Sequence, residues 1–75
     1  MNNHGSHADI GDLVELYSAG GKRLGVHGIV IAVRERGTFH ESLRYLRLKG
    51  PNLDTDDWHL ASFARILSSA RSEDV

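Results

Sequence analysis

Hydrophobic residues alternate with polar ones or run together in short stretches, a pattern that predicts a protein built from β-strands. Residues 12–17 alternate, which is typical of a half-buried strand with Val14 and Leu16 facing the core. Residues 26–34 are β-branched and nearly all apolar, which predicts a central strand covered on both faces. Gly28 inside this run favours a bulge or a sharp bend.

A third strand is predicted over residues 42–49, with Leu46 and Leu48 pointing inward. The outward positions are then Tyr45, Arg47 and Lys49. The apolar residues of this segment also fit a helical spacing. A strand is favoured because a turn precedes the segment and Gly50-Pro51 ends it.

The C-terminal part of the pattern predicts two short strands joined by a tight turn. Residues 57–60 form the first strand and residues 65–67 the closing strand. Between them, residues 61–64 are typical of one turn of 3₁₀ helix, with Ser62 placed to cap it. Phe63 is interpreted as a core residue.

The length of 75 residues predicts one domain. We expect an all-β fold, a five-stranded antiparallel barrel over residues 10–67 with a short 3₁₀ turn before the last strand. Polar residues at both ends predict flexible tails over residues 1–9 and 68–75. There is no cysteine, which fits the cytoplasm, and no apolar run approaches the roughly 20 residues of a membrane span.

Basic residues are concentrated in the middle of the chain. Residues 22–49 hold seven basic and two acidic residues, a net charge of +5, although the whole chain carries −1. Cations beside an aromatic ring are typical of nucleic-acid surfaces. The residues predicted to make such a contact are Lys22, Arg23, Arg34, Arg36, Arg44, Tyr45, Arg47 and Lys49. Interleaving of the segments on folding would instead cancel this field.

An acidic cluster followed by the single tryptophan gives a second candidate surface. Its residues are Asp54, Asp56, Asp57 and Trp58. The carboxylates fit either a solvated turn or a contact for a basic protein partner, and tryptophan is enriched where proteins bind one another. Counted from Asp54, the positions that an EF-hand loop requires as Gly and Glu hold His59 and Arg65, so no calcium loop is expected.

Catalytic and cofactor motifs are not found in the sequence. There is no Gly-x-Ser-x-Gly nucleophile motif, and the Gly-rich turn before Lys22 lacks the spacing of a phosphate-binding loop. No pair of the five histidines has the spacing that preorganises a metal site. We therefore expect no enzyme activity, cofactor or metal.

Near the start of the chain, glycines and apolar residues recur in the order Gly11-Asp12, Val14, Leu16, Gly25, Gly28 and Val30. These residues resemble those of SH3-like small β-barrels of the KOW type. The resemblance covers roughly residues 10–67. It implies that the loop between the first two strands, which carries Lys22 and Arg23, contacts RNA or protein.

The order of segments is also similar, more distantly, to the plasmid-encoded type II dihydrofolate reductases, which are small SH3-like chains. Residues 57–66 match the C-terminal region of that family in shape. Its Val-Gln-Ile-Tyr pore motif is replaced here by residues 55–58 or 57–60, depending on the alignment. Because the Gln and Tyr are missing, the resemblance supports the fold rather than the reductase activity.

The sequence thus predicts a non-enzymatic binding module of a larger assembly, contacting nucleic acid or a nucleoprotein complex through a basic face. The first alternative is a protein–protein module, such as an adaptor, a small complex subunit or a phage-type accessory protein. The second is a reductase-like enzyme, which would require a tetramer. The sequence pI near 6.5 favours self-association as a homo-oligomer.

Overall fold

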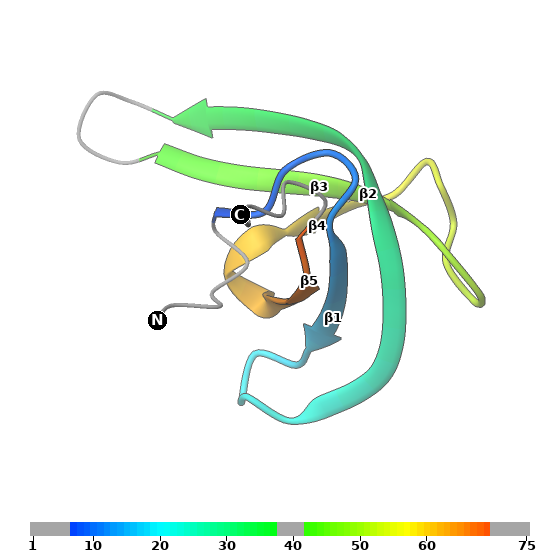
Figure 1. The fold of residues 1–75 in the computed structure, drawn as a ribbon. Helices are drawn as coiled ribbons and strands as arrows, with labels where there is room; N and C mark the ends of the chain where they lie inside the picture. The colour runs from blue at the N-terminus through cyan, green and yellow to red at the C-terminus, as the bar shows by residue number, and fades with distance from the viewer. Residues whose placement is uncertain (1–6, 38–41, 70–75) are drawn as a thin grey trace.

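The computed structural model describes residues 7–37 and 42–69 and holds one five-stranded antiparallel sheet, in the order β4-β3-β2-β1-β5 (Figure 1). The elements are β1 (Leu13–Tyr17), β2 (Arg23–Gly37), β3 (Ser42–Lys49), β4 (Trp58–Leu60), the 3₁₀ turn η2 (Ala61–Phe63) and β5 (Ala64–Ser68). The predicted all-β class, the five antiparallel strands and the turn before the last strand are confirmed. Within the described part of the chain, the sheet stays open between its edge strands β4 and β5.

The long strand β2 organises the sheet because it pairs with a different neighbour along each half. Its first half pairs with β1, from Arg23 opposite Tyr17 to Ile29 opposite Leu13. Its second half pairs with β3, as far as Gly37. The strand curves strongly between these halves (Figure 1). β2 is longer than the predicted residues 26–34 at both ends, because Arg23 still pairs with β1 and Gly37 still pairs with β3.

The prediction that both faces of β2 are covered is wrong. Val30 is almost fully buried, but Ile29 is 41% exposed and Ile31 is 38% exposed. Successive side chains of a strand point to opposite faces, and only one face of this sheet packs on the core. The register shift between Val30 and Ala32 further marks Ile31 as an irregular position in the pairing with β3.

Gly28 is required for close packing. It pairs regularly with Val14, without a register shift at that position. A Cβ atom there would lie 2.5 Å from Leu53 Cδ1 and 2.9 Å from Leu48 Cβ. The irregularity in the pairing with β3 lies at Ile31, three residues further on, while the glycine allows β3 and the following loop to approach.

A small core fills the concave side of the sheet. Val14, Leu16, Leu46 and Leu48 are buried, as the alternation predicts. The other buried hydrophobic residues are Ala8, Val30, Ala61 and Ala64. The inward-facing residues therefore come from all parts of the described chain.

The segment before β1 is packed against the sheet. Ala8 is fully buried, and its carbonyl accepts hydrogen bonds from Arg44 Nε at 2.9 Å and Nη2 at 2.8 Å. The Asp12 side chain is also fully buried, and it accepts a hydrogen bond from the Asp9 amide at 2.9 Å. The packed part of the chain thus includes Ala8 and Asp9, which the sequence places in the N-terminal tail.

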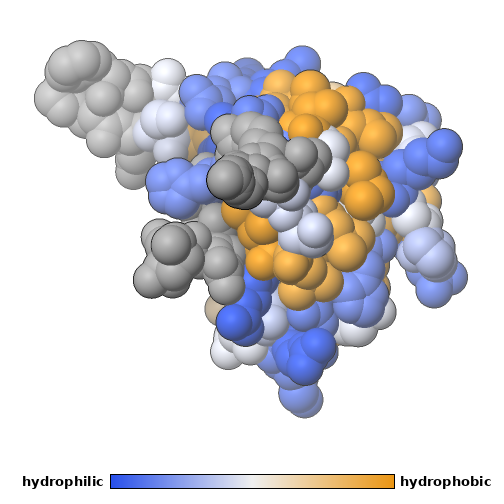
Figure 2. Space-filling view, in the orientation of Figure 1, coloured by the Kyte–Doolittle hydropathy of each residue, from blue (hydrophilic) through white to orange (hydrophobic). Residues whose placement is uncertain are grey.

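The turn η2 differs in detail from its prediction. Leu60 stands at its N-cap, and no side chain caps the turn, so the capping role predicted for Ser62 is wrong. Phe63 is 40% exposed and is not a core residue. On the face shown in Figure 2, hydrophobic surface gathers over η2 and β5, which contribute the exposed side chains of Phe63 and Leu67.

Candidate nucleic-acid interface

The outward face of β2, β3 and β4 brings cations and aromatic rings together. Arg34 on β2 pairs with Tyr45 on β3, and Tyr45 pairs in turn with Leu60 on β4. Two residues further along β3, Arg47 pairs with Trp58. Directly opposed residues in an antiparallel sheet project from the same face. The register therefore joins residues that the sequence placed in two separate candidate surfaces.

Trp58 is the centre of this face. The guanidinium carbon of Arg34 lies 5.0 Å from the centroid of the indole ring, and that of Arg47 lies 5.5 Å away. Both distances are within the range of a cation–π interaction. The ring is half-buried and holds two positive charges in fixed positions at the surface.

Arg47 is further fixed by the loop that precedes β4. Its Nε donates to the Thr55 carbonyl at 2.7 Å, and its Nη2 donates to Asp56 Oδ1 at 3.4 Å. This surface ion pair offsets part of the charge of Arg47. Arg47 therefore serves the face chiefly by holding Trp58.

On this face, Arg34 and Arg36 carry positive charge that can bind an anionic ligand. Within residues 7–37 and 42–69, neither arginine is paired with a carboxylate. Together with Tyr45 and Trp58, they line a recess of about 200 Å³, here termed the arginine recess. An anion that enters it meets two guanidinium groups between two aromatic rings.

The acidic loop is built by its own first residue. Asp54 Oδ1 accepts a hydrogen bond from the Asp56 amide at 2.9 Å, and the Asp54 carbonyl accepts one from the Asp57 amide at 3.1 Å. These bonds are typical of an Asx turn. Asp54 therefore shapes the loop, Asp56 contacts Arg47, and the exposed Asp57 flanks Trp58.

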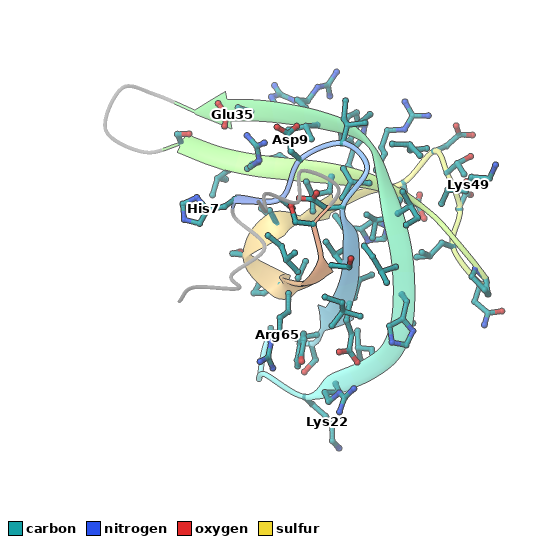
Figure 3. The ribbon with its side chains drawn as sticks, viewed as in Figure 1. His7, Asp9, Lys22, Glu35, Lys49 and Arg65 are labelled. Atoms are coloured by element: carbon teal, nitrogen blue, oxygen red, sulfur yellow. The ribbon has the colours of Figure 1, made fainter. Side chains whose placement is uncertain are left out.

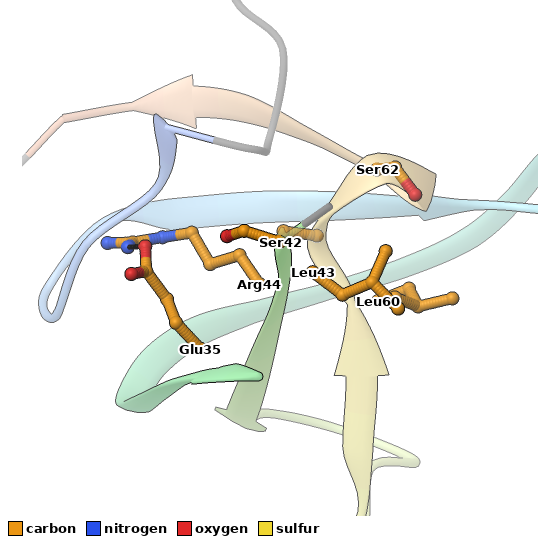
Figure 4. Close-up of a pocket in the computed structure, with 7 residues that line it drawn as sticks. Glu35, Ser42, Leu43, Arg44, Leu60 and Ser62 are labelled. Carbon is orange, nitrogen blue, oxygen red and sulfur yellow. Dashed lines mark hydrogen bonds and ion pairs between the residues drawn. The ribbon is translucent and has the colours of Figure 1, made fainter. Parts of the chain in front are cut away.

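Arg44 lies on the opposite side of the sheet from the arginine recess. Its Nη1 donates to Glu35 Oε2 at 2.6 Å, and its remaining nitrogens reach the Ala8 carbonyl. A shallow recess of about 160 Å³ lies beside this ion pair, between β3 and η2 (Figure 4). Arg44 is therefore occupied in attaching the N-terminal segment to the hairpin of β2 and β3.

Lys22 and Arg23 lie at the far end of the molecule. Lys22 and Glu35 are on opposite sides of the view in Figure 3. Arg23 Nε donates to Glu15 Oε2 at 2.9 Å. This hydrogen bond, opposed by burial of the carboxylate, holds the pKa of Glu15 below its ordinary value and raises the pKa of Arg23. The charge of His27 and a hydrogen bond from Tyr17 lower the Glu15 pKa further.

Lys49 ends β3 opposite Ile29 and lies apart from both groups (Figure 3). Of the eight residues predicted for nucleic-acid contact, the structure thus gathers Arg34, Arg36, Tyr45 and Arg47. Lys22, Arg23, Arg44 and Lys49 lie elsewhere.

An apolar groove that the sequence analysis missed adjoins this face. It has a volume of about 370 Å³ and is here termed the aromatic groove. It is lined by Leu16, Tyr17, Leu24, Tyr45, Trp58, His59, Leu60 and Phe63. The signals in the sequence are two large apolar residues near turns, Leu24 after the Gly-rich turn and Phe63 in the short turn after Leu60. The structure shows both to be exposed.

Comparison of the chain with protein-family models, with curated proteins and with solved structures finds no match. In the described ranges, no three His, Asp or Glu side chains gather where they could hold a metal ion. None of the helical segments in these ranges has the length and hydropathy to cross a membrane.

Proposed function

We propose that the protein is a non-enzymatic binding module that contacts nucleic acid, free or in a nucleoprotein complex. The contact face is formed by Arg34, Arg36, Tyr45, Arg47 and Trp58. One observation carries the proposal. Within the described residues, Arg34 and Arg36 have no carboxylate partner and line the arginine recess together with two aromatic side chains.

This combination suits the two parts of a nucleotide. Guanidinium groups bind phosphate oxygens through several parallel hydrogen bonds, while tyrosine and tryptophan rings offer flat surfaces to bases or sugars. Arg34 is already held over Trp58, at 5.0 Å from the ring centroid. Less side-chain freedom is lost when such a group binds, which favours affinity.

We further propose that the sheet belongs to the SH3-like small barrels. The strong curvature of β2 supports this, because it brings β1 and β3 to different sides of the core. The turn η2 also joins the two edge strands through three residues, so they lie at the two ends of one curled sheet. The contact proposed here lies on β2, β3 and β4, whereas the KOW resemblance points to the first loop.

The proposal is tested by removing the two available arginines. The double variant Arg34→Ala/Arg36→Ala is expected to bind an oligonucleotide more weakly. Each phosphate contact releases about 0.7 to 0.9 counterions from the nucleic acid. Loss of two such contacts should therefore make the slope of log affinity against log salt shallower by roughly 1.4 to 1.8. Fluorescence anisotropy of a labelled oligonucleotide at several salt concentrations measures both quantities.

A matched control removes the same charge elsewhere. Lys22 and Arg65 both lie in the lower part of Figure 3. Glu35, which stands between Arg34 and Arg36 in the sequence, lies in the upper part. The variant Lys22→Ala/Arg65→Ala should therefore keep most of the affinity and most of the salt slope. Equal losses in the two double variants would show a general charge effect and would refute the assigned face.

A protein partner is the second candidate, and the exposed Leu24 and Phe63 of the aromatic groove favour it. Aromatic and leucine side chains in a groove are typical of peptide-binding surfaces. Such a complex should depend on Trp58 and change little with salt. The salt titration described above therefore separates the two candidates.

A further inference from the structure

The arginine recess and the aromatic groove share two side chains. Tyr45 and Trp58 line both of them, so the two hollows adjoin at these side chains. One end of the surface that they form presents Arg34 and Arg36. The other end is lined by apolar side chains from β1, β2, β4 and η2, among them Phe63.

The two ends differ in what they can bind. Tyr17, Tyr45, Trp58 and Phe63 are four of the five aromatic residues in the chain, and all four line the groove. Aromatic rings also attract cations, but the adjacent guanidinium groups would repel a cationic ligand. The surface therefore favours a ligand that joins a flat apolar ring to an anionic group, as a nucleotide does.

We propose that the aromatic groove accepts unpaired bases, so that the ligand of this module is a single-stranded nucleic acid. The inference rests on the proposed function and specifies its substrate class. In a duplex the bases are stacked and paired inside the helix, and only phosphates, sugars and base edges reach the surface. A single strand can place a base against Phe63 and Trp58 while its phosphates lie in the arginine recess.

The volume of the aromatic groove and the exposure of its side chains fit the binding of a base. Its volume of about 370 Å³ falls within the roughly 300 to 1,000 Å³ typical of ligand sites. Leu24 is 52% exposed and Phe63 is 40% exposed. Covering these side chains with a base would remove apolar surface from water without moving the backbone.

The experiment compares three probes. They are an oligothymidylate of about 12 nucleotides, a blunt duplex of the same length, and an abasic strand of the same length. The two single strands carry equal numbers of phosphates, and the duplex carries about twice as many. Trp58 is the only tryptophan, so its fluorescence reports directly on the shared wall of the two recesses. We expect tight binding and strong quenching with the oligothymidylate alone. Oligouridylate in place of oligothymidylate tests whether the module prefers RNA or DNA.

Variants of Phe63 test the groove without altering charge. Phe63→Leu keeps apolar bulk but removes the ring, and it should weaken single-strand binding by roughly 5- to 100-fold. Phe63→Tyr keeps the ring and should bind like the parent protein. Since no cation changes, the salt slope should stay the same in both variants. Thermal melting of each variant verifies that it is folded.

The outcomes separate this inference from the proposed function. Equal affinity for the oligothymidylate, the duplex and the abasic strand would overturn the groove assignment, while the effect of Arg34→Ala/Arg36→Ala could still hold. Equal binding by Phe63→Leu and Phe63→Tyr would likewise overturn it. Absence of binding to every probe at low salt would refute both proposals and favour a protein in the groove.

Discussion

Glu15 is almost completely covered although it lies on the outward side of β1. Its side chain is only 2% exposed, and Arg23 Nε donates to it at 2.9 Å. Tyr17 donates to the other carboxylate oxygen at 3.4 Å, and His27 approaches to 3.9 Å. A covered carboxylate is tolerated when charged donors satisfy it. Glu15 therefore links the end of β1 to the beginning of β2.

The charge of Glu15 should make stability depend on acid. Its folded-state pKa is lowered from 4.5, chiefly by the Arg23 hydrogen bond. The unfolded chain therefore takes up the proton first as pH falls, and the stabilisation is present above about pH 4.5 and lost as pH drops through the folded-state pKa. Glu15→Gln should unfold at a lower urea concentration than the parent at pH 7. The difference should shrink as pH falls below about 4.5.

Asp57→Asn provides the control for that titration, because Asp57 is exposed and its side chain has no ion pair within the described residues. It should change the urea midpoint little at either pH. A Glu15→Gln deficit that stays constant from pH 7 to pH 3 would contradict the assigned role of the carboxylate charge.

Arg44 illustrates that a basic residue near a binding face can be structural. It holds the buried Ala8 carbonyl and Glu35 at the same time. Arg44→Ala should lower the free energy of unfolding by about 1–3 kcal/mol, since hydrogen bonds to charged groups are lost. Urea denaturation measures this. The salt slope of oligonucleotide binding should not change. A slope that falls as in Arg34→Ala/Arg36→Ala would show that Arg44 contacts the ligand.

Single residues were predicted well where their position depends only on alternation. The inward positions of Val14 and Leu46 are examples. The environments of Glu15 and Trp58 could not be predicted, because each depends on the register between two strands. The Arg34 side chain contacts the Trp58 ring only because β2 and β4, which carry these residues, both pair with β3. Nothing in the local sequence of either residue reports this neighbour.

At the scale of elements, the tight contact at Gly28 is the clearest constraint on β2. Gly28→Ala would place a Cβ atom 2.5 Å from Leu53 Cδ1 and 2.9 Å from Leu48 Cβ. Such overpacking should lower the free energy of unfolding by about 1–3 kcal/mol. Thermal melting or urea denaturation measures the loss. Leu53→Ala in the same chain should restore part of it, because the closest clash is removed.

Gly20→Ala is the matched control for Gly28→Ala. A Cβ atom at Gly20 meets nothing closer than Ser18 Oγ at 3.9 Å, and its φ is not positive. The expected change in the free energy of unfolding is about 0.5 kcal/mol or less. Equal effects at the two positions would mean that the loss arises from backbone freedom rather than from packing.

The order and type of the elements followed from turn signals and apolar runs, but their lengths did not. β2 begins at Arg23 and ends at Gly37, beyond the apolar residues 26–34. Its extensions are exposed, so hydrogen bonding to β1 and β3 defines them rather than burial. A hydrophobic pattern carries no information about such pairing. The prediction of Phe63 as a core residue is wrong for a related reason. An aromatic side chain suggests burial, but the sequence does not show which elements surround it.

At the scale of the whole molecule, the basic middle segment does not form one positive face. Arg34 and Arg36 line the arginine recess, whereas Arg23, Arg44 and Arg47 form ion pairs. Lys22 and Lys49 lie apart from the recess. Interleaving of the segments, the alternative that the sequence left open, therefore brings acidic partners to about half of these basic residues. The two charges at the recess, Arg34 and Arg36, lie close together on β2, which suits a contact with a short stretch of nucleic acid.

The strand order also has a consequence for synthesis of the chain. β1 pairs with β2 soon after both leave the ribosome, but its second partner, β5, is made only after β3, β4 and η2. Until then β1 is an edge strand with unpaired amide and carbonyl groups, a surface that promotes aggregation. A chain that stopped before Ala64 would keep this edge permanently exposed. Premature termination in the last part of the chain should therefore yield an insoluble product rather than a shortened functional one.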